Sequence, residues 1–284
     1  MKLEDTLIFY NWMPSISDWV VDYTDEYYKL CGVSSIHNKP YLSKDNISLI
    51  SEGDIIFVKT DFLRDNRFQQ NILPLINVPF ILVSGVSSYN VDNYKPILES
   101  DKVIKWYCTN PPCEHEKIIG LPIGFEEKER DGGDQEALQS FLSRDIEKKD
   151  KILLPYHTKS TNPSRNKSTE YLQSLSFVDV QEDKLPFSDY LNLLSQYKYC
   201  ICLEGAGFDT HRNYECLLTG TVPIMKRSGV ELIYKDYNLP SRFLEDWNEI
   251  DDSFYEELKN TDFDFSGVEK FLQTKTHIER IKND

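Results

Sequence analysis

The sequence predicts an α/β protein with two Rossmann-like units. Short apolar runs rich in β-branched and aromatic residues alternate along the chain with stretches of helical period. Most of these runs are continuously apolar, as parallel strands covered on both faces are. The alternation is interrupted by the charged, glycine-containing segment 126–136 and then resumes. A chain of 284 residues is long enough for two domains of ordinary size.

The first half of the chain carries five runs that we predict to be strands. Between the second and third, the segment 63–76 has apolar side chains at Leu63, Phe68, Ile72 and Leu75, a spacing that favours a helix. The five predicted strands are LIFYNW (7–12), DIIFVK (54–59), PFILVSG (79–85), VIKWYCT (103–109) and IIGLPIG (118–124).

The second half repeats this alternation. Helical stretches are predicted at 137–151, 165–175 and 186–197, and a helix-like tail at 271–284 is not assigned to either unit. We therefore divide the chain into a first unit (1–126), a linker and helix (127–150) and a second unit (151–284). The predicted strands of the second unit are KILLPYH (151–157), SFVDVQ (176–181), YKYCICLEG (197–205) and TVPIMK (221–226).

Charge excludes two classes of partner. The chain has 32 Lys and Arg against 47 Asp and Glu, a formal net charge of -15. This excess repels nucleic acid and anionic membrane surfaces at long range, but it allows an anionic small ligand where cations are concentrated. No run approaches the roughly 20 apolar residues that span a bilayer.

The six cysteines form no CxxC pair, and we expect them to be reduced structural thiols. Two of them alternate along a predicted strand and should share one face. The acidic start MKLEDT does not resemble a signal peptide, so we expect a cytoplasmic protein. The cysteines are Cys31, Cys108, Cys113, Cys200, Cys202 and Cys216.

The stretch CLEGAGFDTHRNYECLL (202–218) predicts a strand, a glycine-containing turn and the start of a helix. Asp209 or Thr210 can cap this helix. Arg212, Asn213 and the free backbone N–H groups of the first turn favour an anion there. Gly205 and Gly207 allow the backbone to approach a ligand closely.

Two further side chains of this helix have spacings that bring them to the same face. Arg212 and Glu215 are three residues apart, and His211 and Glu215 are four apart. An arginine suits a diphosphate, and a glutamate one turn further suits the paired hydroxyls of a ribose. A surface ion pair between Arg212 and Glu215 is the alternative.

A second polar segment, LLPYHTKSTNPSRNKS (153–168), follows a predicted strand. Its hydroxyl groups, Lys159 and Arg165 suit an anion, and a solvated loop is the alternative. Because both segments follow parallel strands of one sheet, they should lie at the same edge. The hydroxyl residues nearest the strand are Thr158, Ser160 and Thr161.

Three acids are candidates for a general base. Asp61 comes just beyond a predicted strand, where a carboxylate can project into a cleft and accept a proton from a hydroxyl group. Asp18 and Glu126 are its rivals, and each of the three can instead be a helix cap or a solvated acid. The histidines are scattered without zinc-ligand spacing. The DFD at 262–264 resembles the Asp-x-Asp that holds a metal and a nucleotide sugar.

At these residues the chain resembles exostosin-type glycosyltransferases. CLEGAGFDTHRNYECLLTGTVPIM resembles their C-terminal signature of a glycine-containing turn, an Arg, a Glu and a small-residue–Pro–apolar strand. The segment 153–168 resembles the first strand and loop of the donor domain in small relatives. Together with similarity in the first half, the resemblance covers most of residues 50–250. It includes short acidic versions encoded by large algal viruses, such as chlorovirus capsid-glycan xylosyltransferases.

The resemblance implies a GT-B architecture, with two Rossmann-like domains facing across a cleft. The first domain would bind a glycan acceptor, and the second a UDP-sugar, with UDP-xylose as one candidate. It also implies an inverting transfer that needs no metal or cofactor, in the host cytoplasm if the protein is viral. By the family pattern Glu215 would bind the ribose and Arg212 the diphosphate. Arg165, with Ser160 and Thr161, would stabilise the leaving nucleoside diphosphate.

The sequence departs from the family pattern at two places. Relatives often carry His or Asp after the strand at 79–83, where this chain reads SGVSSY, so the base remains open. His211 stands where small polar residues are commoner, and the pattern assigns it no task. Two other functions also stay open: a metal-dependent transferase of the single-domain GT-A kind using Asp262 and Asp264, and a non-catalytic carbohydrate-binding protein.

Overall fold

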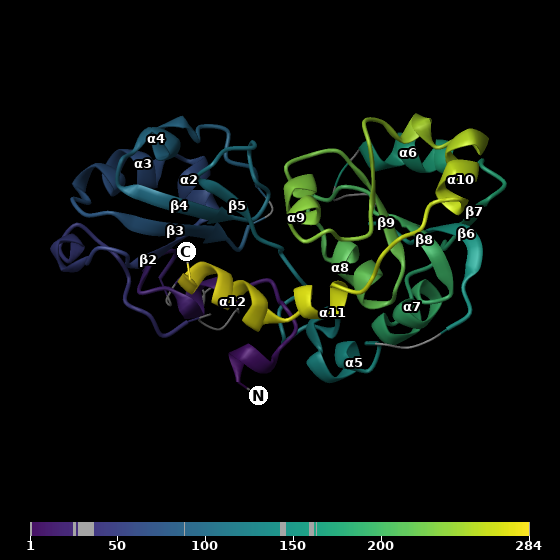
Figure 1. The fold of residues 1–284 in the computed structure, drawn as a ribbon, viewed down its shortest axis with the longest axis horizontal. Helices are drawn as coiled ribbons and strands as arrows, with labels where there is room; N and C mark the ends of the chain where they lie inside the picture. The colour runs from purple at the N-terminus through teal and green to yellow at the C-terminus, as the bar shows by residue number, and fades with distance from the viewer. Residues whose placement is uncertain are drawn as a thin grey trace.

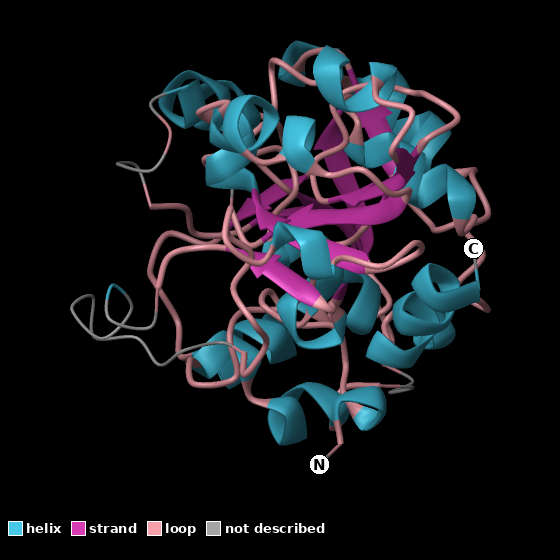
Figure 2. Ribbon diagram, turned by 90° about the vertical axis from the view of Figure 1, so that its left-hand side faces the viewer, coloured by secondary structure: helices cyan, strands magenta, loops and turns pink. Residues whose placement is uncertain are grey.

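A computed structural model describes residues 2–24, 27, 37–87, 89–142, 146–158, 162 and 164–283. It contains two α/β units, which lie side by side in Figure 1. Each unit is built on a five-stranded sheet, and all the strands of both sheets are parallel. Seen from the side, the strands run through the middle of the molecule with helices outside them (Figure 2). The predicted two-unit α/β class is confirmed.

The first sheet has its strands in chain order, β1-β2-β3-β4-β5. Connections between parallel strands are right-handed. When each new strand is added on the same side of the previous one, all of these connections therefore lie on one face of the sheet. The helices on that face are α2 (Thr60–Arg64), α3 (Arg67–Asn71) and α4 (Lys95–Glu99), with the short 3-10 turns η3 (Ile47–Leu49) and η4 (Leu73–Leu75) between strands. The strands are β1 (Trp19–Val21), β2 (Ile55–Lys59), β3 (Phe80–Gly85), β4 (Val103–Cys108) and β5 (Ile118–Gly120).

The opposite face of the first sheet is covered by the two ends of the chain. Along β2, Ile56 and Val58 belong to the core under the helices, whereas Ile55 and Phe57 belong to the other core. That second core is completed from far away in sequence by η2 (Met13–Ile16) and by α12 (Thr274–Asn283). In Figure 1 α12 lies beneath the first sheet. The tail, which the predicted division included in the second unit (151–284), therefore packs on the first unit, because Ile278 and Ile281 complete its second core.

The second sheet has the order β10-β9-β8-β6-β7. From β6 the chain moves to one side for β7 and to the other side for β8, which makes the C-terminal ends of β6 and β8 a topological switch point. The strands are β6 (Lys149–Leu154), β7 (Val178–Val180), β8 (Tyr197–Ile201), β9 (Val222–Lys226) and β10 (Arg242–Leu244).

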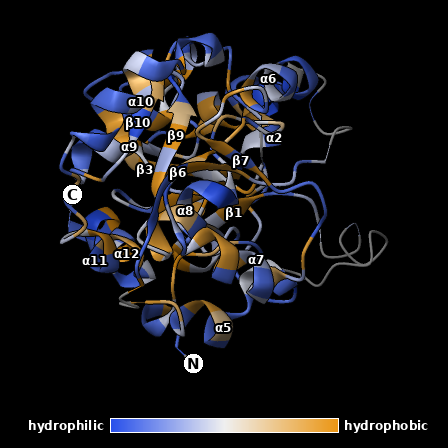
Figure 3. Ribbon diagram, turned by 90° about the vertical axis from the view of Figure 1, so that its right-hand side faces the viewer, coloured by the Kyte–Doolittle hydropathy of each residue, from blue (hydrophilic) through white to orange (hydrophobic). Residues whose placement is uncertain are grey.

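Helices cover both faces of the second sheet. One core packs against α7 (Phe187–Leu194), α8 (His211–Leu218), α9 (Val230–Asp236) and α11 (Val268–Phe271). The other packs against α6 (Ser164–Leu172), η6 (Trp247–Glu249) and α10 (Asp252–Lys259). Figure 3 shows apolar colours concentrated on the strands and hydrophilic colours on the outer helices and loops.

Three predicted elements were wrong. Residues 7–12 form no strand but only isolated bridges, Leu7 to Gln273 and Phe9 to Phe125, because this segment is buried where the units meet. The helix predicted at 63–76 is broken at Asn66, whose φ of 59° is left-handed. The helix predicted at 137–151 is short: α5 (Gln135–Gln139) begins at the Asp134 cap, and Lys149 already belongs to β6.

The sequence also missed two strands, β1 and β10. Each has three residues and lies at the edge of its sheet. A segment this short carries no measurable alternation. Among the described residues, no helix is long and apolar enough to cross a bilayer.

Lys148 stabilises the second unit by joining the ends of two helices. Its ammonium group donates to the carbonyls of Ser195 and Thr219, both at 2.7 Å. These residues cap the C-termini of α7 and α8, where carbonyls lack partners and the helix dipole favours a cation.

We predict that Lys148→Met lowers the free energy of unfolding by about 2 kcal/mol, because it removes charged hydrogen bonds and leaves half-buried carbonyls without a donor. Urea denaturation followed by circular dichroism measures this loss. The matched control is Lys198→Met, which removes a surface ion pair with Asp150 and should change stability by less than about 0.5 kcal/mol. Equal losses in the two variants would contradict the role given to Lys148.

Candidate functional site

A cavity of about 950 Å³ opens at the switch point of the second sheet. The loops that follow β6, β7 and β8, the start of α8, and the segment that leaves the first unit all line it. Open α/β sheets bind ligands at such points, because neighbouring loops diverge there. The lining residues used below are Glu126, Tyr156, His157, Thr158, Arg165, Gln181, Leu185, Phe187, Tyr190, His211, Arg212 and Glu215.

Two arginines are held in place by backbone carbonyls at the edge of this cavity. Arg212 donates to the carbonyl of Tyr156 at 3.0 Å and to the Tyr190 hydroxyl at 3.2 Å. Arg165 donates to the carbonyl of Glu204 at 2.8 Å and to that of Thr158 at 3.3 Å. Burial lowers the pKa of Arg165, and Arg212 beside it lowers that pKa further. Two fixed cations this close together form a site for an anion with more than one charge.

Glu215 lies one helical turn deeper than these cations. Its carboxylate is buried and lines the cavity. Burial raises the pKa of Glu215, although Arg212 and a hydrogen bond from Tyr190 oppose the rise. At Arg212, burial lowers the pKa of the guanidinium, but Tyr190 and Glu215 outweigh it and the pKa is raised. Arg212 and Glu215 therefore interact electrostatically inside a cavity rather than as an exposed surface pair.

His211 connects the cavity to the first unit. Its Nδ1 lies 2.7 Å from the carbonyl oxygen of Gly124, and its ring contacts Tyr10 edge-on. Since a carbonyl only accepts, Nδ1 carries the proton of this bond. Gly124 has φ +71°, and a Cβ there would lie 2.7 Å from the carbonyl of Ile8, so glycine is required at this position.

Asp209 makes a second, buried connection between the units. Its Oδ2 accepts from the backbone N–H of Ile123 at 3.1 Å and from the Tyr214 hydroxyl at 2.6 Å. Its own N–H donates to Asn110 in the first unit at 2.9 Å. Burial raises the pKa of Asp209 to about 6, although these donors oppose the rise.

The structure brings together Arg165, His211, Arg212, Glu215, Thr158 and Glu126, six of the residues that the sequence suggested. The side chain of Asn213 instead donates to Asp209 and accepts from Thr210, away from the cavity lining. The backbone of Gly205 donates to the carbonyl of Gly207, and Gly205 lies against Arg165. Ser160 and Thr161 lie outside the described residues.

Asp61 and Asp18 do not line this cavity. Asp61 lies at the C-terminal end of β2, where Lys59 is 3.9 Å away and its Oδ2 is buried without a hydrogen-bond partner among the described residues. Asp18 accepts from the backbone N–H of Ile55 and so fixes the start of the same strand. Glu126 is the candidate acid that the structure places in the cavity, close enough to Glu215 to raise its pKa.

Several cavity residues escaped sequence reasoning, among them His157, Gln181, Phe187 and Tyr190. Phe187 and Tyr190 lie in the helix predicted at 186–197, to which the sequence assigned no part in a site. His157 is the last residue of a predicted strand, and its position next to Thr158 was the feature of the sequence that could have indicated a place in the cavity. Gln181 ends the next predicted strand and reaches the cavity only because β7 pairs with β6.

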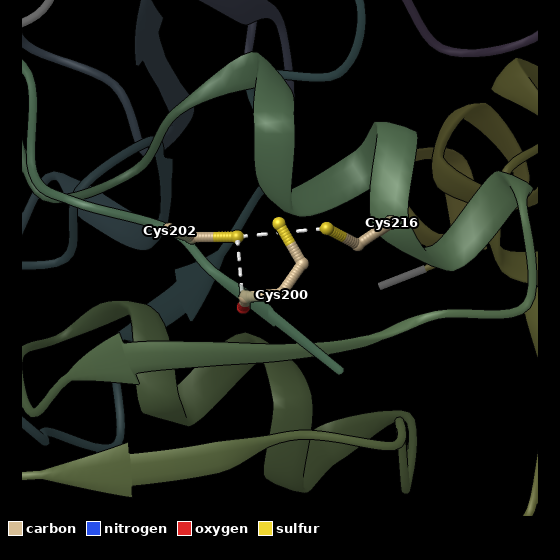
Figure 4. A group of neighbouring side chains, drawn as sticks. All are labelled: Cys200, Cys202 and Cys216. Atoms are coloured by element: carbon tan, nitrogen blue, oxygen red, sulfur yellow. Dashed lines mark hydrogen bonds between the residues drawn. The ribbon is translucent and has the colours of Figure 1, made fainter. Parts of the chain in front are cut away.

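Three cysteines lie directly behind the site, between β8 and α8 (Figure 4). Cys200, Cys202 and Cys216 are buried, and their sulfur atoms lie within 4.8 Å of one another. Cys200 and Cys202 both face the core beneath α7 and α8, as their alternation predicted. Within the described part of the chain, this is the one cluster of three side chains with metal-ligand spacing. Asp262 and Asp264 are exposed between α10 and α11 and do not line the cavity.

Comparison with known proteins gives limited similarity. No family model matches the chain, and no curated protein matches it. A crystal structure of a GtfA/B complex has a TM-score of 0.40 and 9% identity, over 84% of this chain and 59% of that one. Pneumococcal O-GlcNAc transferase GtfA in complex with UDP and GlcNAc has a TM-score of 0.30 and 10% identity, over 84% and 55%. The chain thus matches less than two thirds of the length of either structure.

We predict a pH dependence of stability from Asp209. Its pKa is raised to about 6 in the folded protein, above the unfolded value of about 3.9. The folded state therefore binds this proton more tightly, and the resulting stabilisation is lost as pH rises through 6. Between pH 5.5 and 7.5 the wild type should lose about 1 kcal/mol relative to Asp209→Asn, which cannot titrate.

Urea denaturation of both proteins at the two pH values measures this difference. Other titrating groups such as Glu215 are present in both and cancel. The variant should be less stable throughout, because an amide NH₂ would face one of the donors now bonded to Asp209. A stability difference that is the same at both pH values would contradict the raised pKa.

Proposed function

We propose that the protein is a GT-B glycosyltransferase that moves a sugar from a nucleoside diphosphate sugar to a hydroxyl group of a glycan acceptor. The observation that carries this proposal is the combination of Arg212, Arg165 and buried Glu215 in one cavity at the switch point. Two cations match a diphosphate, and a carboxylate one turn away matches vicinal ribose hydroxyls. The exostosin-type resemblance favours UDP as the nucleotide and xylose as a candidate sugar.

The other lining residues suit the rest of a nucleotide. Leu185 and Phe187 supply apolar surface in the same cavity, against which a nucleobase can pack. Thr158 contributes a hydroxyl group beside Arg165. The loop that contains Gly205 and Gly207 supports Arg165 from behind, and Ser160 and Thr161 remain predicted phosphate ligands.

The chemistry we propose is an inverting displacement without a metal ion. The acceptor oxygen attacks the anomeric carbon while the bond to the diphosphate breaks, and Arg212 and Arg165 stabilise the charge that develops on the leaving group. Because carbonyl oxygens already orient both guanidiniums, little reorganisation is needed. Among the three candidate acids, we assign the general base to Glu126, which lines the cavity, and keep Asp61 as the alternative.

We predict that Glu215 determines recognition of the ribose. Wild-type protein should bind UDP about tenfold to a hundredfold more tightly than 2′-deoxy-UDP, because a buried carboxylate loses a hydroxyl donor. In Glu215→Ala the two affinities should become nearly equal. Isothermal titration calorimetry measures both, with Glu231→Ala, outside the cavity, as the matched control. A Glu215→Ala variant that keeps the preference for UDP would contradict this role.

We predict that Glu126→Gln lowers turnover by at least about 100-fold and leaves UDP affinity within about threefold, since the amide keeps the shape but cannot accept the proton. Turnover is first measured as slow hydrolysis over a panel of nucleotide sugars that includes UDP-xylose, which also identifies the donor. Asp61→Asn is the matched variant. If Asp61→Asn abolishes turnover and Glu126→Gln does not, the base is Asp61.

The same panel decides between the function classes. Loss of hydrolysis on addition of a chelator would favour a metal-dependent transferase that uses Asp262 and Asp264. Binding of oligosaccharides without hydrolysis of any nucleotide sugar would favour a non-catalytic carbohydrate-binding protein. Absence of any calorimetric signal with UDP at millimolar concentration would overturn the proposed function.

A further inference from the structure

The segment 156–158 is held between the two arginines of the cavity. Arg212 donates to the carbonyl of Tyr156 at 3.0 Å, and Arg165 donates to the carbonyl of Thr158 at 3.3 Å. The side chain between these two anchored carbonyls is that of His157, which lines the cavity. A histidine is thus fixed at the place where both guanidiniums converge.

The hydrogen bonds of His157 define which nitrogen carries its proton. Its Nε2 is buried and has no hydrogen-bond partner among the described residues. The ring does bond to the carbonyl of Pro155, and the nitrogen that does so is therefore Nδ1. Since a carbonyl only accepts, Nδ1 carries the hydrogen, and Nε2 holds a lone pair. Burial, together with Arg212 and Arg165, lowers the pKa of His157 to about 2, so the ring is neutral in the empty cavity.

A lone pair at this position conflicts with the ligand that the cations require. Diphosphate oxygens are acceptors, and an unprotonated Nε2 beside them would leave two acceptors facing each other. Burial still opposes protonation in the complex, but the negative charge of the ligand offsets the two guanidiniums that also keep the ring neutral. A proton on Nε2 is then stabilised by the negative charge of the diphosphate and by the hydrogen bond that it donates to a diphosphate oxygen.

We propose that His157 takes up one proton when a nucleoside diphosphate binds, and that its Nε2–H then donates to a diphosphate oxygen. The proposal rests on the proposed function and adds a third donor that forms only in the complex. The proton comes from solvent and adds to the Nε2 lone pair, giving an imidazolium, and it returns to solvent when the nucleotide leaves. The charge that develops on the leaving group during transfer is stabilised by the same donor.

Several other titratable or charged groups face the cavity from the elements around His157. Arg212, Glu215 and His211 come from α8, Tyr190 from α7, and Arg165 from α6. Glu126 comes from the end of the first unit, Arg130 and Asp131 from the linker, and Lys184 from the loop after β7. Of these, His211 is the rival for proton uptake near neutral pH, but its Nδ1 is already bonded to Gly124 in the first unit. A test must therefore distinguish the two histidines.

Isothermal titration calorimetry with UDP measures the uptake directly. Titrations at pH 7.5 in buffers of different ionisation enthalpy give the number of protons bound per UDP, and at this pH the terminal phosphate of UDP, with a pKa near 6, is largely ionised. For the wild type we expect about one half to one proton, with UDP affinity falling about twofold to tenfold from pH 7.5 to 8.5. His157→Gln should bind UDP with almost no uptake and a nearly flat pH dependence. His115→Gln, outside the cavity, is the matched control and should behave as the wild type.

Each alternative result is decisive. If UDP binds to the wild type without proton uptake, or if uptake persists in His157→Gln, the inference is overturned while the proposed function stands. Proton uptake that disappears in His211→Gln and persists in His157→Gln would belong to His211, and it would also overturn the inference. If His157→Gln does not fold, ¹⁵N spectra of histidine in the wild type still decide, because protonation of Nε2 shifts the His157 nitrogens when UDP is added. No UDP binding at all would overturn both proposals.

Discussion

The buried carboxylate of Asp209 is the constraint on which the site depends. It accepts the N–H of Ile123 from the first unit and the hydroxyl of Tyr214 from α8, while its backbone N–H donates to Asn110. One residue therefore fixes the loop after β8 to the first unit and also sets the start of α8. His211 and Arg212 follow within the next three positions, so their placement is a consequence of this contact. Burial of an ionisable group costs stability, and the hydrogen bonds donated to the Asp209 carboxylate offset part of that cost.

The two sheets have different topologies, and this difference decides where a ligand can bind. The first sheet grows in chain order and has no point at which neighbouring loops diverge. Its strands carry apolar residues on both faces, one covered by connecting helices and the other by η2 and α12. The second sheet reverses direction at β6, and the charged cavity lies at that reversal. The first unit therefore contributes anchoring contacts and Glu126 to the cavity, and the second contributes Arg165, Arg212 and Glu215.

Much of the fold and part of the candidate site could be predicted from the sequence, for physical reasons that particular residues show. Apolar runs predicted eight of the ten strands that the described residues form, because buried parallel strands need apolar residues on both faces. The spacing of Arg212 and Glu215 placed them on one helix face, and the structure puts both in the cavity. His157 and Gln181 could not be assigned in this way, since their position depends on which strands pair. The segment 7–12 was wrongly predicted to be a strand for a related reason. It is apolar because it is buried between the units, and not because it pairs in a sheet.

The net charge of -15 is compatible with the proposed anion site, because hydrogen bonds already orient Arg212 and Arg165. Guanidiniums that are already bonded to the carbonyls of Tyr156 and Thr158 lose little conformational entropy when a diphosphate binds. Their mutual repulsion is the cost of this arrangement: together with burial, the larger cause, it lowers the pKa of Arg165 and keeps the His157 ring neutral. A multiply charged anion relieves that repulsion, whereas a neutral ligand does not. The repulsion between Arg212 and Arg165 thus favours multiply charged anions, the ligand class that can relieve it.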